Sequence, residues 1–86
     1  GIYQSYLTVS EKAIQIGRFD LAEIYIIEAR KYQQENAGEI IGDAAADDMA
    51  VKLAEAMIVK ADTLNSRKKS RQALELYDKA AAVFLR

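Results

Sequence analysis

The sequence predicts an all-α protein whose four helices form two antiparallel helical hairpins. Proline is absent from the 86 residues and glycine occurs only four times, so few positions force a helix to stop. In each of four segments, apolar residues recur at spacings of three and four, which is the helical period. The composition, 51% apolar and 29% charged, is typical of a folded soluble protein and not of a disordered chain.

The first predicted helix covers residues 2–16. Its apolar residues recur at helical spacing and share one face: Tyr3, Tyr6, Val9, Ala13 and Ile16. Gly17 follows directly, and glycine is the usual residue in the left-handed cap that ends a helix. We therefore expect this helix to end at Gly17.

The second predicted helix covers residues 20–34, with Asp20 as its N-cap and Glu23 as the capping-box partner. The run of residues 24–27, IYII, is β-branched and aromatic, which alone favours a strand. A half-buried strand needs a polar residue at every second position, and the run has none. The neighbouring apolar residues fall into helical rows, so we predict a helix.

The third predicted helix begins near Asp43, a second predicted N-cap, and runs for roughly 22 residues to the polar stretch NSRKKS at residues 65–70. The fourth covers residues 71–86. One of its sides carries Leu74, Tyr77, Ala81 and Phe84. Because it reaches the last residue without a stop signal, we expect either a fragment or an apolar end that another molecule covers. We predict one domain, with hairpins at 2–36 and 44–86 joined by a connection at 37–43.

The two hairpins look like copies of one unit. The segments AEIYIIEA (residues 22–29) and ALELYDKA (residues 73–80) both have alanine in the first and eighth places, at an offset of 73 − 22 = 51 residues. Their bulky residues, Ile26 and Tyr77, also correspond. At the same offset upstream, Tyr6 pairs with Met57, Ser10 with Ala61 and Ala13 with Leu64. Small residues at such places let two helices approach closely.

This pattern resembles the tetratricopeptide repeat. The residues that carry the resemblance are Ser10, Ala22, Ile26 and Ala29 in the first copy and Ala61, Ala73, Tyr77 and Ala80 in the second. The resemblance covers residues 3–32 and 55–86. It implies a right-handed array of hairpins that holds a partner protein, and a plain four-helix bundle is the alternative.

The sequence departs from that family in spacing. Tandem copies in the family repeat every 34 residues, so the offset of 51 leaves 17 extra residues, which we assign to a lengthened third helix or to a hinge at NAGEIIGD, residues 36–43. The family's proline after the second helix is absent. Residues 56–86, with the run ALELY at 73–77, are also similar to the microtubule-interacting and trafficking domain, a three-helix bundle whose second helix carries an AL-x-LY run and which binds helical tails.

Composition excludes several function classes. The chain has no cysteine and no histidine, so Ser-His and Cys-His catalysis and His- or thiolate-held metals cannot be built. A net charge of −1 argues against a nucleic-acid binder, and the apolar runs are too short for insertion into a membrane. The acids Asp43, Asp47 and Asp48 could hold a cation, but acids also favour the first turn of a helix. We expect no catalytic residue, no metal and no cofactor.

We expect a protein or peptide partner, or other copies of the chain. If the tetratricopeptide resemblance holds, the partner lies against the first helix of each hairpin. The residues implied are Gln4, Leu7, Glu11 and Ile14, then Glu55, Ile58, Asp62 and Asn65. The basic cluster Arg67, Lys68, Lys69 and Arg71 is either a dock for an acidic partner or a solvated turn. The eight residues on the first helices lack the Lys and Asn pattern with which some family members bind a C-terminal carboxylate. An amphipathic or basic segment is therefore the expected ligand.

Overall fold

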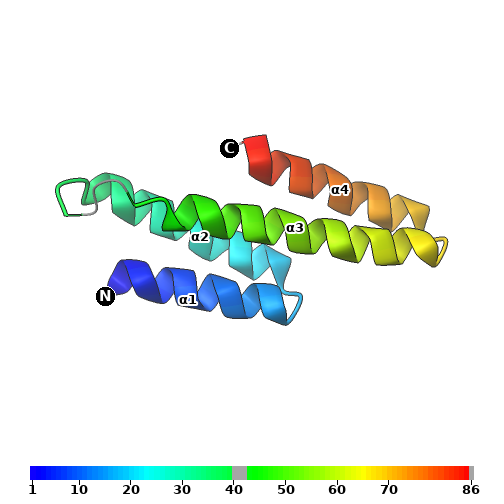
Figure 1. Cartoon of the computed structure of the whole chain (residues 1–86), viewed down its shortest axis with the longest axis horizontal. Helices are drawn as coiled ribbons and strands as arrows, with labels where there is room; N and C mark the ends of the chain where they lie inside the picture. Colours follow the sequence, from blue (N-terminus) through cyan, green and yellow to red (C-terminus); the bar gives the residue numbers. More distant parts are fainter. Residues whose placement is uncertain (40–42, 86) are drawn as a thin grey trace. The chain divides into compact units, whose positions relative to one another are not determined.

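The computed structural model of the chain describes residues 1–39 and 43–85, and within them all regular structure is α-helical (Figure 1). The four helices are α1 (Ile2–Gln15), α2 (Phe19–Glu35), α3 (Ala45–Ser66) and α4 (Ser70–Leu85). The predicted all-α class and the number of helices are therefore confirmed. Most bounds differ from the predicted ones by only one or two residues.

The chain divides into two compact units, Gly1–Ala50 and Val51–Arg86. The division falls inside α3, whereas the sequence placed the break in the connection at residues 37–43. The first residues of α3 therefore group with α1 and α2, and the rest of α3 groups with α4. The arrangement of the two predicted hairpins as an array or a bundle stays a prediction.

A tight turn joins α1 to α2. Gly17 has φ +77°, the left-handed conformation that was predicted for it. Its N–H donates to the carbonyl oxygen of Ile14 at 3.1 Å, and the N–H of Arg18 donates to that of Ala13 at 2.8 Å. These two bonds form a Schellman motif, which satisfies carbonyls that the end of α1 would otherwise leave unpaired.

The turn between α3 and α4 repeats this geometry at the offset of 51 residues. Lys68 corresponds to Gly17 and has φ 61°. Its N–H donates to the carbonyl oxygen of Asn65 at 3.0 Å, and the N–H of Lys69 donates to that of Leu64 at 2.9 Å. Each of these positions is the first turn's position plus 51. The internal repeat seen in the sequence is thus also a repeat of backbone structure.

The helix starts only partly follow the predicted caps. Asp20 is not the N-cap of α2: the N-cap is Arg18, without a side-chain cap bond, and Asp20 lies in the first turn. The positive end of the helix dipole also stabilises a carboxylate in the first turn, so an acidic residue there is easily taken for the N-cap. Asp43 is also not the N-cap of α3, because the first helical bond, from the N–H of Asp48, goes to the carbonyl oxygen of Ala44. Asp43 lies one position earlier, and its Oδ1 accepts the N–H of Ala45 at 2.7 Å.

Small buried residues line the packed sides of α1 and α2. Ser10, Ala13, Ala22 and Ala29 are at most 2% exposed, so the two backbones can approach closely. The one polar member is satisfied, because the Ser10 hydroxyl donates to the carbonyl oxygen of Leu7 at 2.8 Å. Ile26 is buried as well, as expected for the bulky position of the repeat.

The first turns of α3 complete the core of the first unit. Tyr3, Leu7, Ala29 and Ala46 form a buried cluster, with Tyr6, Tyr32, Ala45 and Met49 packed around it. By the offset of 51, the start of α1 at Ile2 corresponds to residue 53, so α3 begins 53 − 45 = 8 residues early. The third helix is thus longer than its counterpart, and its extra turns pack on α1 and α2. The alternative, a hinge at residues 36–43, includes residues 40–42, which lie outside the described residues.

The second unit pairs the remainder of α3 with α4, which run antiparallel in Figure 1. Its small residues Ala61, Ala73 and Ala80 are buried, as their counterparts are in the first unit. The Tyr77 hydroxyl on α4 donates to Oδ1 of Asp62 on α3, which links the two helices. This bond has no counterpart in the first unit, where Ile26 occupies the position of Tyr77.

Substitutions at the two left-handed positions should change stability in opposite directions. Gly17→Ala should destabilise the protein by about 1 kcal/mol, because alanine is strained at positive φ. Nothing lies within 4 Å of a Cβ added at Gly17, so the cost comes from the backbone alone. Lys68→Gly should stabilise by up to about 1 kcal/mol, less the added entropy of the unfolded chain. Urea denaturation of both variants measures this, and destabilisation by Lys68→Gly would contradict it.

The hydroxyl of Tyr3 should be dispensable for folding. Tyr3 is 8% exposed, and its buried oxygen has no partner in hydrogen-bond geometry among the described residues. Burial raises the pKa of Tyr3, and the nearby backbone of Ala46 opposes this only in part. An unpaired buried polar group costs about 1–3 kcal/mol, so Tyr3→Phe should leave stability unchanged or raise it. Thermal and urea unfolding test this, with Tyr3→Leu as the control that removes the ring. A loss above about 1 kcal/mol in the phenylalanine variant would instead indicate a hydrogen bond to water or backbone.

Candidate interaction site

The predicted partner-facing residues of α1 do not all reach the surface. Gln4 is exposed, and Glu11 and Ile14 are half-buried. Leu7 is only 2% exposed and belongs to the core cluster, so its assignment to a partner surface is wrong. The physical reason is the early start of α3, which brings Ala46 into the same cluster. The repeat pattern contains no such segment, so it could not indicate this burial.

The predicted residues of α3 lie in the second unit. Glu55 and Asn65 are exposed and Ile58 is half-buried. Asp62 is exposed too, but its carboxylate already accepts the hydroxyl of Tyr77. A partner that binds Asp62 would have to compete with that bond. Since the two predicted sets belong to different units, each is a separate candidate surface.

The basic cluster forms the turn between α3 and α4. Arg67, Lys68, Lys69 and Arg71 are all exposed. Three of them also build the turn, because the Schellman bonds use the backbone N–H groups of Lys68 and Lys69 and the N–H of Arg67 bonds to Thr63 and Leu64. Their backbone role explains the local sequence without a ligand. Binding of an acidic partner by their side chains stays a prediction.

The acids near the start of α3 have protein partners. Asp47 accepts a charged hydrogen bond from Arg30 Nη2 at 2.9 Å, which joins α2 to α3 within the first unit. The Oδ1 of Asp43 accepts the N–H of Ala45 at 2.7 Å, and the backbone carbonyl of Asp43 accepts Gln33 Nε2 at 2.7 Å. Over the described ranges, no group of three or more acidic side chains is arranged to hold a metal ion. An exposed pair such as Arg30–Asp47 contributes at most about 1 kcal/mol.

Exposed apolar side chains follow one side of α1 and its C-cap, Ile16. Ile2, Val9 and Ile16 are spaced by seven residues, and Ile16 is 71% exposed. We call these three residues the α1 row. Ser5 and Lys12 lie between them and are exposed and polar. Residues seven apart lie on the same side of a helix, so the row supplies one of the two apolar positions per heptad at which helices pack along one another.

Helix α2, which contains the run IYII at residues 24–27, also leaves some of its apolar residues outside the core. Ala22, Ile26 and Ala29 are buried, whereas Ile24 and Ile27 are 55% and 43% exposed. Only part of the apolar surface of this segment is therefore buried inside the first unit, and the rest faces outward.

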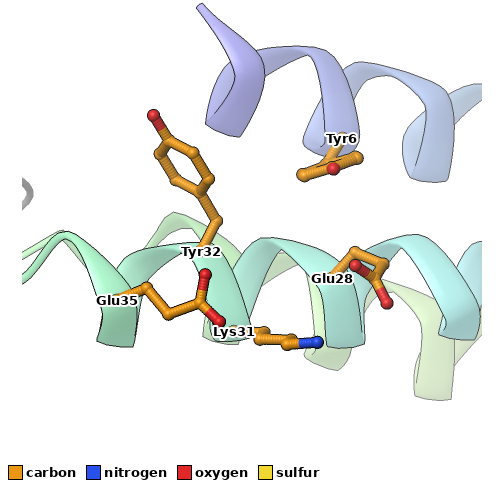
Figure 2. Close-up of a pocket in the computed structure, with 5 residues that line it drawn as sticks. All are labelled: Tyr6, Glu28, Lys31, Tyr32 and Glu35. Atoms are coloured by element: carbon orange, nitrogen blue, oxygen red, sulfur yellow. The ribbon is translucent and has the colours of Figure 1, made fainter.

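A small surface pocket of about 130 Å³ lies between α1 and α2 (Figure 2). Its lining residues are Tyr6 from α1 and Glu28, Lys31, Tyr32 and Glu35 from α2. We call this site the tyrosine pocket. Figure 2 shows the ring of Tyr6 facing α2 and the ring of Tyr32 rising from α2 towards α1. The tilted ring of Tyr25 supports Tyr6, with ring centroids 5.9 Å apart.

The charged groups of the tyrosine pocket are not paired with one another. Glu28, Lys31, Tyr32 and Glu35 occupy one stripe of α2, at positions i, i+3, i+4 and i+7. Among the described residues, no ion pair joins Lys31 to either glutamate. Two carboxylates and one ammonium therefore give the lining a formal charge of −1 at neutral pH.

Sequence reasoning missed the tyrosine pocket. Tyr6 lies on the predicted apolar face of the first helix, and both Tyr6 and Tyr32 do pack against the core cluster. The stripe at positions 28, 31, 32 and 35 is visible in the sequence, but it looks like an ordinary solvated face. Only the register between α1 and α2 brings Tyr6 over that stripe, and this register is a tertiary property.

Comparisons with known proteins give no family. No protein-family model matches the sequence, and neither the curated proteins nor the solved structures that were searched contain a match. Within residues 1–39 and 43–85, no helix combines the length and the apolar character needed to cross a bilayer. The geometry of the two units is therefore the basis for a functional proposal.

Alkaline pH should weaken the second unit through Tyr77. Its hydrogen bond to Asp62, followed by burial and the negative charge of that carboxylate, raises the Tyr77 pKa above its usual 10.0. The unfolded chain therefore loses this proton first, so the bond's contribution is intact below pH 10 and is lost as pH rises through the folded pKa. Urea denaturation from neutral to alkaline pH should show a steeper loss in wild type than in Tyr77→Phe. Equal slopes would contradict the prediction.

Proposed function

We propose that this chain is a non-catalytic protein-interaction module, a helical adaptor or scaffold that binds a peptide or helix of a partner. The observation that carries the proposal is the α1 row, a line of exposed apolar residues at a spacing suited to packing along a helix. Exposed apolar surface in a small domain marks an interaction site when its residues are aligned and not scattered.

Two further features support a binding role. The repeated turns and the small residues at equivalent positions make each helix pair a rigid support, which lowers the entropy lost when a surface binds. The backbone repeat is also consistent with the tetratricopeptide resemblance, in which helix pairs hold other proteins. Ile24 and Ile27 offer additional apolar contact area on α2.

The alternative is self-assembly, and the surface of α4 favours it. Leu74, Phe84 and Leu85 are large, apolar and exposed, and Leu85 is 87% exposed. Leu74, Ala81 and Leu85 fall on one stripe of the helix, and all three are exposed. A second copy could cover this stripe, which would give the chain a structural role in an oligomer.

Replacing the α1 row should abolish partner binding without unfolding the chain. The variant Ile2→Gln, Val9→Gln and Ile16→Gln removes exposed apolar groups, so its stability should stay within about 1 kcal/mol of wild type. Tagged wild-type and variant proteins are used for quantitative affinity capture from the source cells. Val59→Gln is the matched control, since Val59 is exposed, apolar and on α3.

Proteins that wild type and Val59→Gln retain, and that the triple variant loses, would support the adaptor proposal. Equal capture by all three would contradict it. Light scattering over a tenfold concentration range separates the alternative: self-assembly gives a mass that rises with concentration and that Phe84→Glu lowers. A monomer at every concentration excludes self-assembly and leaves the adaptor reading.

A further inference from the structure

We propose that the tyrosine pocket binds an arginine side chain of the partner. This inference rests on the proposed function and names the chemistry of one contact within it. The volume of the pocket, about 130 Å³, is well below the roughly 300–1,000 Å³ of pockets for drug-sized ligands. The pocket therefore suits a single side chain and not a separate small molecule.

The charge of the lining selects a cation. Glu28 and Glu35 stand one on each side of Tyr32 along the stripe, and Lys31 supplies the only positive charge among the lining residues. An anion would be repelled by the two carboxylates. An apolar side chain would desolvate them without replacing their hydrogen bonds to water, which is unfavourable. A cation is attracted, and its N–H groups can donate hydrogen bonds to a carboxylate of the lining.

The two tyrosine rings favour arginine over lysine. A guanidinium group is planar, so it can stack on an aromatic face while its N–H groups donate to a carboxylate in a bidentate pair. It is also more weakly hydrated than an ammonium group, so entry into a partly buried pocket costs less. Tyr6 is held by Tyr25, and Tyr32 packs against the core cluster, so neither ring must become ordered on binding.

Lys31 should act as an internal competitor. Its position, three residues after Glu28 and four before Glu35, lets its ammonium group reach either carboxylate after a rotamer change. Its charge reduces the attraction of the pocket for any other cation. Removal of this charge should therefore strengthen arginine binding. If the charged residues of the stripe only keep the surface of α2 solvated, the same substitution should not change the affinity for a ligand.

The probe is N-acetyl-arginine amide, titrated into the isotope-labelled full chain and followed by amide chemical shifts. The neutral isostere N-acetyl-citrulline amide is the matched ligand control. We expect weak, saturable shifts centred on Tyr6, Glu28, Tyr32 and Glu35 with the arginine probe and none with citrulline. Lys31→Gln should tighten binding about threefold, and Glu28→Gln with Glu35→Gln should weaken it about tenfold, as one or two exposed charge contacts would.

Glu75→Gln on exposed α4 is the matched protein control, because it changes net charge as Glu28→Gln does but lies outside the pocket. It should leave the affinity unchanged. Equal binding of citrulline, equal weakening by Glu75→Gln, or no saturable shift would overturn the proposal. Circular dichroism confirms that each variant is folded. The probe does not use the α1 row, so failure here leaves the capture result standing, and failure of capture leaves this result standing.

Discussion

The close approach of paired helices at small residues is the constraint on which the rest of the structure depends. Alanine and serine at the buried positions of α1 and α2 remove the side-chain bulk that would hold the backbones apart. Three of these four positions are also small and buried in α3 and α4, as Ala61, Ala73 and Ala80, whereas Leu64 takes the place of Ala13. Close backbones require a short connection, and the left-handed turn at Gly17 or Lys68 provides one in each pair. Ser10 is small enough for such a buried position, and its hydroxyl is not left unpaired there because it donates to the carbonyl oxygen of Leu7 in the same helix.

Much of this fold could be predicted from the sequence, because helix periodicity and glycine caps are local properties. The position of Gly17 indicated both where α1 ends and the conformation of the turn. At the second turn, polarity indicated the break but not that Lys68 adopts the left-handed conformation, since lysine gives no such signal. The sequence predicted Asp20 as the N-cap, but Asp20 is the second residue of α2. The helix dipole favours an acidic residue in the first turn as well as at the cap.

The candidate site was much less predictable, because it depends on how helices meet. Leu7 carries the spacing of a partner-facing residue, yet the first turns of α3 bury it. The tyrosine pocket needs Tyr6 from α1 over four residues of α2, and no local pattern fixes that register. Exposure of the α1 row is likewise a consequence of which face of α1 packs inward. A sequence pattern can give the faces of a helix, but not which neighbour covers each face.

The early start of α3 means that the chain supplies its own occupant for part of the α1 surface. Ala46 lies in the cluster with Leu7, on a segment that is covalently joined to α2 by a short connection. Such a tethered segment acts at an effective concentration of the order of millimolar, which a free peptide rarely reaches in a cell. External ligands are thereby directed away from Leu7 and towards the surfaces that the chain leaves uncovered.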